Sequence, residues 1–244
     1  MKEVNFRIIS QTCIARDVYR MVLAGDTTAV TAAGQFVNIR LDGLYLRRPI
    51  SVCDREPDKL TIIYKVVGKG TAQMAALPDG TGLSVLTGLG NGYDLRKSGD
   101  RPLLIGGGVG VPPLYLAAKL LRNEGKTVAA VLGFNTADDV FYADEFRALG
   151  VRTIVTTADG SLGTRGFVTD ALPQAGAYSY VYTCGPEPML KAVYNAVGTG
   201  GQFSFEERMG CGFGACMGCT CKTKYGSKRI CTDGPVLEKE EIVW

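Results

Sequence analysis

Residues 102–114 read PLLIGGGVGVPPL, and this stretch decides the fold class. An apolar run ends in glycines, and two prolines then open PPLYLAAKLLRNEG, which has the composition of a helix. A strand followed by a glycine-rich turn and a helix is typical of dinucleotide-binding folds. Glycine lets the backbone approach a pyrophosphate, and the helix N-terminus favours the negative charge. A tight turn without a ligand is the alternative. The candidate residues are Gly106, Gly107, Gly108 and Gly110.

Strand-like and helix-like stretches alternate from residue 101 to about residue 200. TVAAVLGF, VRTIVTTA and YSYVYTCG are strand candidates, and DVFYADEFRALG, FVTDALPQ and EPMLKAVYNAV are helix candidates. This alternation predicts a parallel sheet with helices on both faces. The last strand leads into Cys184, Gly185 and Pro186, at the sheet edge where ligands bind. The Cys184 thiol could contact a nicotinamide ring there, or it could be an ordinary buried cysteine.

Residues 1–98 have the pattern of a small antiparallel barrel. FRIIS, VYRMVLA, FVNIRL, LTIIYKVV and LSVLTGL are rich in β-branched and aromatic residues and are separated by turn residues. In the segment LRRPISVCD, Arg48 supplies a permanent cation for a pyrophosphate and Ser51 can hydrogen-bond a flavin. Gly68, Gly70 and Thr71 could add a second phosphate contact through backbone N–H groups. Both segments could instead be ordinary strand ends.

Residues 201–244 are dominated by cysteine. MGCGFGACMGCTC has the spacing C-x4-C-x2-C, and a further cysteine follows in RICTDGP. This is the spacing of plant-type [2Fe–2S] sites. A zinc site with four thiolates and a set of unligated thiols are the alternatives. Cys221 is a fifth candidate, but the x2 spacing favours Cys219. The predicted ligands are Cys211, Cys216, Cys219 and Cys231.

Composition narrows the class of function. The net charge is +3, with acids and bases mixed along the chain, so we expect neither a nucleic-acid surface nor a membrane surface. The N-terminus lacks the apolar core of a signal peptide, and we expect a cytoplasmic protein. The chain has no histidine. The commonest general base is therefore absent, and the chemistry must rest on cofactors or on other side chains.

Taken together and in this order, the motifs resemble the ferredoxin-reductase superfamily. In that family a β-barrel binds flavin through an RPxS-type motif, and the next domain binds NAD(P) through GGGxGxxP and CGP motifs. Within it, LRRPIS, TADGSLGTRGFVTD, EERMGCGFGAC and CTDGPVLEKEEIVW resemble the electron-transfer subunits of NAD-dependent, heteromeric (class 1B) dihydroorotate dehydrogenases of pyrimidine biosynthesis. The resemblance covers the whole chain.

The resemblance implies a mixed β and α/β fold. Its parts would be an antiparallel FAD-binding β-barrel at residues 1–98, a parallel α/β NAD-binding domain at 99–200 and a small [2Fe–2S] domain at 201–244. It also implies the cluster ligands named above, and we expect Cys184 to be the catalytic residue. The FAD contacts that it implies are Arg48, Pro49, Ile50, Ser51, Ile63, Tyr64, Lys65, Gly70 and Thr71, and the NAD contacts are Gly106, Gly107, Gly108, Gly110, Gly185 and Pro186.

The implied partner is the FMN-containing catalytic subunit of dihydroorotate dehydrogenase, in a heterotetramer of two copies of each chain. Electrons would pass from that FMN through [2Fe–2S] and FAD to NAD⁺. A related FAD and [2Fe–2S] reductase subunit of a hydrogenase, a sulfide dehydrogenase or a ferredoxin:NADP oxidoreductase is the alternative. NTADD, after the strand TVAAVLGF, lacks arginine and carries two acids, which favours NAD over NADP.

Overall fold

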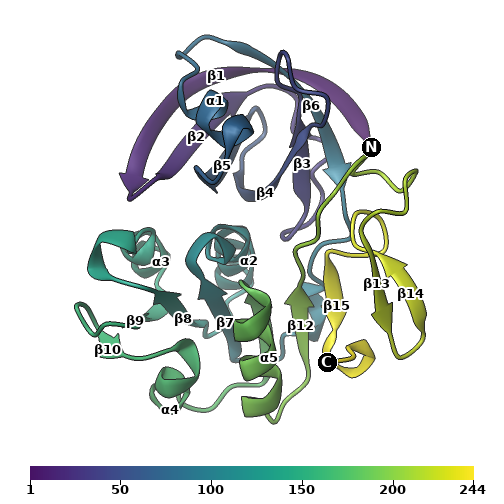
Figure 1. The fold of residues 1–244 in the computed structure, drawn as a ribbon. Coiled ribbons are helices and arrows are strands. Elements are labelled where there is room, and N and C mark those ends of the chain that lie inside the picture. Colours follow the sequence, from purple (N-terminus) through teal and green to yellow (C-terminus); the bar gives the residue numbers. More distant parts are fainter.

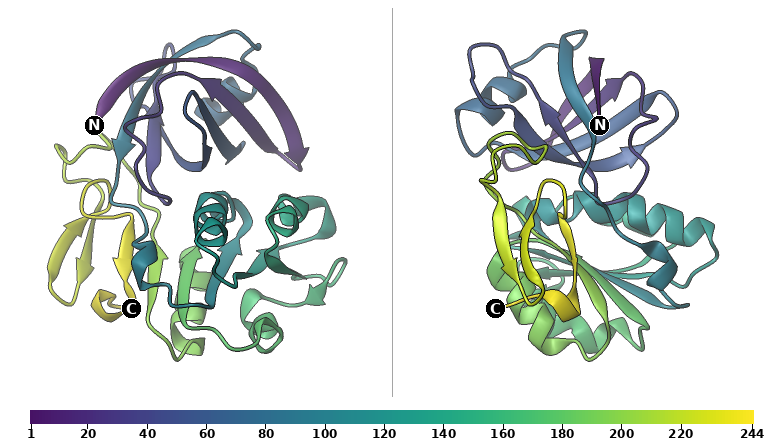
Figure 2. Two further views of the ribbon diagram at one scale, coloured as in Figure 1. Left: turned by 180° about the vertical axis from the view of Figure 1, so that it is seen from behind. Right: turned by 90° about the vertical axis from the view of Figure 1, so that its right-hand side faces the viewer.

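The computed structural model describes all 244 residues, which form three parts (Figure 1). A β-barrel lies above a sheet covered by helices, and the cysteine-rich segment lies beside both. The two further views show that the C-terminal segment follows the edge of the sheet and reaches up to the barrel (Figure 2). The cysteine-rich segment therefore borders both of the other parts.

The barrel is closed and antiparallel, as the sequence predicts. The strand order β1-β2-β5-β4-β3-β6 brings β4 between β5 and β3. The RPIS motif, which the sequence pattern placed after an expected strand, opens β4 itself, and the segment after β5 forms a short helix, α1. The elements are β1 (Lys2–Ala15), β2 (Val18–Ala24), β3 (Phe36–Ile39), β4 (Arg48–Arg55), β5 (Lys59–Lys65), α1 (Lys69–Ala75) and β6 (Gly82–Leu89).

The second part is a seven-stranded sheet in the order β10-β9-β8-β7-β11-β12-β15. All of its pairings are parallel except that of β12 with β15. The strands are β7 (Pro102–Gly107), β8 (Ala129–Phe134), β9 (Arg152–Thr157), β10 (Thr164–Arg165), β11 (Tyr180–Cys184), β12 (Gly201–Ser204) and β15 (Val236–Glu238).

Helices cover both faces of this sheet. Helices α2 and α3 lie on the face toward the barrel, and α4 and α5 lie on the opposite face (Figure 1). The helices are α2 (Pro112–Asn123), α3 (Ala143–Ala148), α4 (Leu172–Ala175) and α5 (Glu187–Ala196), with 3-10 turns at Leu95–Lys97, Gly108–Gly110, Ala137–Asp139, Val168–Ala171 and Lys239–Glu241. None of the helices combines the length and the apolarity that crossing a membrane would require.

Two apolar cores hold the three parts together. Leu104, in the middle of β7, belongs to a core that also contains the barrel interior and the inner faces of α2 and α3. Its neighbours Leu103 and Ile105 point to the other face of the sheet and share a core with Cys219 and Cys231. Because successive residues of a strand face opposite sides, one strand contributes to both cores.

The third part is a cysteine-bearing loop followed by a hairpin of β13 (Thr220–Thr223) and β14 (Gly226–Arg229). Strands β12 and β15 flank this segment in sequence but pair within the large sheet. Residues 201–244 therefore share their backbone hydrogen bonding with the middle part. The division at residues 98 and 200 stays a prediction.

Candidate cofactor sites

The RPIS motif and the segment with Gly68, Gly70 and Thr71, which were both predicted to contact the flavin cofactor, meet on the barrel. Arg48 opens β4, and Gly70 lies in the first turn of α1. A β-carbon on Gly70 would lie 2.0 Å from Nε of Arg48, so only glycine leaves room for the guanidinium. The Thr71 hydroxyl accepts hydrogen bonds from the N–H groups of Val67 (2.9 Å) and Gly68 (3.2 Å) and fixes the turn before α1. A permanent cation in a cradle of small residues fits the pyrophosphate of FAD.

Other predicted flavin contacts support this cradle from the barrel wall. Pro49, Ile50 and Ser51 are half-buried on β4, whereas Ile63 and Tyr64 on β5 are buried. The Tyr64 hydroxyl donates to Oε1 of Gln11 at 2.8 Å. Nε2 of Gln11 in turn donates to the carbonyl oxygens of Met74 and Ala75, at the end of α1. The Tyr64 side chain is thus engaged in holding α1 in place, and its contact with flavin stays a prediction.

The two nucleotide motifs of the α/β part interlock through their glycines. A β-carbon on Gly110 would lie 2.2 Å from the carbonyl oxygen of Cys184. One on Gly107 would lie 2.5 Å from Sδ of Met189, and one on Gly185 would lie 2.5 Å from Cε of the same methionine. Gly110 therefore lets the turn after β7 pack against the end of β11, and Gly107 and Gly185 leave room for the Met189 side chain of α5. Gly108 differs, because φ is +51° and no atom lies within 4 Å of its β-carbon position.

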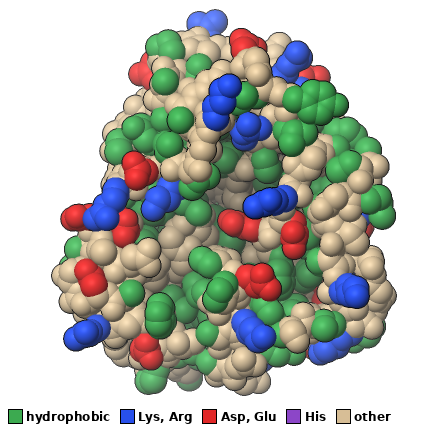
Figure 3. All heavy atoms as spheres, in the orientation of Figure 1, with side chains coloured by type: hydrophobic (Ala, Val, Ile, Leu, Met, Phe, Trp, Pro, Cys, Tyr) green, Lys and Arg blue, Asp and Glu red, His purple; other side chains and the backbone are tan.

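A cavity of about 440 Å³ opens beside these turns, where the carboxyl ends of the parallel strands meet. Gly107, Gly108 and Pro186 line it, together with Asn135 of the NTADD segment and Phe167 of the TADGSLGTRGFVTD segment, neither of which was predicted as a site residue. Lys65, expected only as a flavin contact, also lines it from the barrel side. Figure 3 shows the molecule hollowed between the barrel and the α/β part, with charged side chains around the hollow. The position of the cavity and the residues that line it fit an extended dinucleotide.

The predicted catalytic thiol lies beneath this region. Cys184 is 2% exposed at the end of β11 and is not among the residues that line the cavity. Burial, with a smaller contribution from the nearby Glu206 carboxylate, raises the pKa of Cys184 to about 12, so the thiol stays protonated. Glu206 opens the segment EERMGCGFGAC, but its proximity to Cys184 appears only in the fold.

The cysteine loop is organised by hydrogen bonds to sulfur. Sγ of Cys211 accepts hydrogen bonds from the N–H groups of Ala215 (3.2 Å), Cys216 (3.4 Å) and Phe213 (3.5 Å). Burial alone would raise the pKa of Cys211, but the hydrogen bonds from Phe213 and Cys216 outweigh burial and lower the pKa to about 6. A thiolate held by backbone N–H groups fits a metal-bound sulfur.

The four predicted ligands approach one another in two pairs. Cys211 and Cys216 are neighbours, since Sγ of each accepts a hydrogen bond from the backbone N–H of the other. Cys219 and Cys231 form the second pair, with a hydrogen bond of 3.4 Å from the N–H of Cys231 to Sγ of Cys219. Two pairs of sulfurs fit a cluster with two metal ions.

Cys221 makes no hydrogen bond to either pair. It lies on β13, two residues after Cys219, and it is half-buried whereas Cys219 is buried. Cys221 lines a separate groove with Phe205 and Trp244. Burial raises the pKa of its thiol. The predicted ligand set, with Cys219 rather than Cys221, is compatible with this placement.

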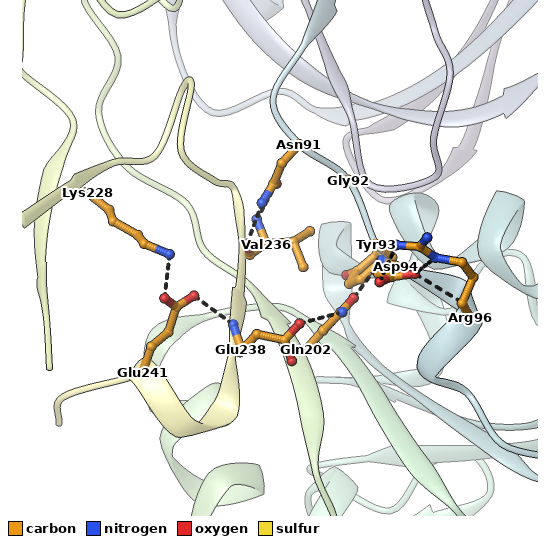
Figure 4. A pocket seen from close by; sticks show the side chains of 10 residues that line it. All are labelled: Asn91, Gly92, Tyr93, Asp94, Arg96, Gln202, Lys228, Val236, Glu238 and Glu241. Carbon is orange, nitrogen blue, oxygen red and sulfur yellow. Dashed lines mark hydrogen bonds and ion pairs between the residues drawn. The ribbon is translucent and has the colours of Figure 1, made fainter. Parts of the chain in front are cut away.

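A polar cavity of about 480 Å³ lies where the three parts meet (Figure 4). Its side chains are bonded to one another. Lys228 of the cysteine hairpin pairs with Glu241, and Glu241 accepts a hydrogen bond of 2.9 Å from the N–H of Glu238. The Glu238 carboxylate accepts from Nε2 of Gln202 (2.9 Å), and Oε1 of Gln202 accepts from the N–H of Asp94 (2.9 Å). This chain of contacts ties the cysteine hairpin to the sheet and to the segment that leaves the barrel.

Comparison with known proteins identifies the family of this chain. Residues 206–243 match the iron–sulfur cluster binding domain of dihydroorotate dehydrogenase B, and residues 104–195 match the oxidoreductase NAD-binding domain. The chain is 48% identical to the dihydroorotate dehydrogenase B (NAD(+)) electron transfer subunit of Fusobacterium nucleatum subsp. nucleatum, over 99% of both chains. The chain belongs to the family of dihydroorotate dehydrogenase B electron transfer subunits.

Other members and a solved structure agree with this membership. The electron transfer subunit of Shouchella clausii is 44% identical over 99% of this chain and 98% of its own. A chain in the structure of an NADH-dependent reduced ferredoxin-NADP oxidoreductase, described in terms of flavin-based electron bifurcation, superposes with a TM-score of 0.89 at 32% identity. It covers 98% of this chain and 90% of that one. The ferredoxin-reductase fold with an iron–sulfur segment at its C-terminal end, expected from the motifs, is confirmed.

Proposed function

We propose that this chain is the electron transfer subunit of an NAD-linked dihydroorotate dehydrogenase and works with FAD, [2Fe–2S] and NAD. The observation that carries the proposal is the paired arrangement of four thiols, in a chain that matches this family along its whole length. Arg48 would hold the FAD pyrophosphate, the cleft at Gly107 and Pro186 would hold NAD, and Cys211, Cys216, Cys219 and Cys231 would hold the cluster.

The bound cofactors supply the redox chemistry, since a flavin exchanges hydride with NAD and single electrons with an iron–sulfur cluster. The residues of the chain bind these cofactors and orient them. The interlocked glycines Gly107, Gly110 and Gly185 shape the floor on which a nicotinamide would rest. Cys184 offers a neutral thiol below that floor, because its raised pKa keeps the proton on sulfur.

The partner would be an FMN-containing catalytic subunit, in a complex of two copies of each chain, and dihydroorotate would be oxidised on that partner. We place the complex in the cytoplasm, because the four cysteines outside the proposed cluster form no disulfide and thiols remain reduced there. The test uses this chain alone and co-expressed with the catalytic subunit. The chain alone should oxidise NADH with an artificial acceptor but leave dihydroorotate untouched, and the pair should reduce NAD⁺ with dihydroorotate. Dihydroorotate turnover by this chain alone would contradict the proposal.

Phe167 should contribute to NAD binding. The ring is 70% exposed and lines the cleft, so it offers a flat apolar surface to an adenine. Stacking of a base on an aromatic ring is worth about 1–3 kcal/mol, so we expect Phe167→Ala to raise the KM for NADH on the order of tenfold with little change in kcat. Leu162→Ala, an exposed residue of the same region outside the cleft, is the control. An unchanged KM in the Phe167 variant would refute this role.

Cys184→Ala should show whether the thiol affects the rate of flavin reduction or only the stability of the fold. Removing one buried heavy atom costs about 1 kcal/mol of unfolding free energy. If the thiol supports the nicotinamide, stopped-flow reduction of the flavin by NADH should slow on the order of tenfold, because small misplacements in an active site have large effects on rate. A variant that loses stability without losing rate would leave Cys184 as a core residue only.

A further inference from the structure

Asn38 lies between the flavin-binding strands and the cysteine loop. It is 1% exposed on β3, and its partner across the sheet is Pro49 of the RPIS motif on β4. Its Nδ2 donates a hydrogen bond of 3.1 Å to the carbonyl oxygen of Cys211. This is the only hydrogen bond that joins a barrel strand to residues 206–219. One side chain therefore links the strand beside the flavin motif to the first predicted cluster ligand.

Packing alone does not explain an asparagine here. Val37 and Ile39, on either side of it, point into the barrel core, whereas Asn38 and Phe36 face the other way. Oδ1 of Asn38 is buried and has no hydrogen-bond partner within the chain. A buried acceptor without a donor is costly, and an aliphatic side chain of similar size would avoid that cost. What the amide adds is the donor that reaches Cys211.

The cysteine loop is shaped to meet this donor. Gly212, directly after Cys211, has φ +78°, and a β-carbon there would lie 2.4 Å from Nδ2 of Asn38. The other arm of the segment is held separately by Asn91 (Figure 4). Asn91 exchanges hydrogen bonds with both backbone groups of Val236, at 2.8 and 3.1 Å, and its N–H donates to the carbonyl oxygen of Gly234 at 2.7 Å. The barrel thus reaches the Cys211–Cys216 arm by hydrogen bonding only through Asn38.

We propose that Asn38 is a positioning residue that fixes the Cys211 end of the cluster loop against the flavin-bearing barrel. Through the Cys211 backbone it sets the surroundings of the iron that Cys211 and Cys216 would hold. Groups that support metal ligands in this way typically change metal affinity 10- to 100-fold when they are removed. The inference rests on the proposed function, because it takes Cys211 as a ligand.

The test replaces the amide by an aliphatic group of similar size in the full-length protein. We expect Asn38→Leu to keep FAD but to release iron to a chelator about tenfold faster. We also expect altered g-values in the electron paramagnetic resonance spectrum of the dithionite-reduced protein. Asn5→Leu is the matched control, because Asn5 is exposed on β1 and its side chain makes no hydrogen bond. A wild-type spectrum and a wild-type release rate in Asn38→Leu would overturn the inference.

A second variant acts from the loop side. Gly212→Ala should shift the same signals, because its methyl group would displace the Asn38 amide. Gly226→Ala carries a comparable backbone strain at φ +113° with no atom within 4 Å, and it should leave both signals unchanged. If Asn38→Leu fails to fold, this pair decides the question, and equal spectra for the two glycine variants would refute the inference. A wild-type protein without iron would instead refute the proposed function itself.

Discussion

Cys231→Ser should lose the cluster. Cys231 is 2% exposed and is paired with Cys219, which precedes it by 12 residues. Serine is a harder and weaker donor than thiolate for iron. We expect the iron content to fall from about two atoms per chain to near zero, together with the visible absorption of the cluster. Iron analysis and the visible spectrum of the anaerobically purified variant check this.

The matched control is Cys221→Ser. Cys221 lies on β13, lines the groove with Trp244 and makes no hydrogen bond to either pair of thiols. This variant should keep about two irons and the cluster spectrum. The opposite result, with Cys221 essential and Cys231 dispensable, would overturn the ligand assignment while leaving the flavin site intact.

Arg48→Ala should strip FAD from the protein. The guanidinium lies in the cradle that Gly70 leaves open, and a pyrophosphate there would lose its charge-assisted partner. Hydrogen bonds to charged groups contribute about 1.5–3 kcal/mol, so the Kd for FAD should rise about 10- to 100-fold. The measurement is FAD retained after gel filtration, followed by fluorescence titration of the stripped protein.

Arg47→Ala separates this effect from a general loss of positive charge. Arg47 precedes Arg48 but turns away from the cradle, pairing with Glu3 at 2.7 Å and donating to the carbonyl oxygen of Ser84 at 3.1 Å. It should retain FAD. Gly70→Val should reproduce the loss seen in Arg48→Ala, since its side chain would occupy the place of the guanidinium. Full FAD occupancy in Arg48→Ala would remove Arg48 from the flavin site.

The sequence predicts those elements whose local residue preferences match the conformation that they adopt in the folded protein. The glycines after β7 mark the turn because both conformation and close packing demand them, as at Gly110 against Cys184. The spacing of the cysteines identifies the cluster segment, because a loop around a metal site is local in sequence. The barrel follows from its short β-rich runs, although strand β4 was not expected at the RPIS motif.

What the sequence could not predict depends on contacts between distant segments. Nothing near Glu206 signals that its carboxylate lies by Cys184, and nothing near Asn38 signals its bond to Cys211. Strand β15 joins the large sheet only because the chain returns to its edge after the hairpin. Lys65 lines the nucleotide cleft because the barrel is docked above it. Such contacts arise from the packing of the three parts.

The most direct test of the central claim is an anaerobic titration of the purified chain with NADH, followed by visible absorption and electron paramagnetic resonance. NADH should bleach a bound flavin, and the signal of a reduced [2Fe–2S] cluster should then appear in the same sample. Cys231→Ser should retain the bleaching without the signal. A colourless protein, or one that contains zinc and gives neither change, would contradict the account.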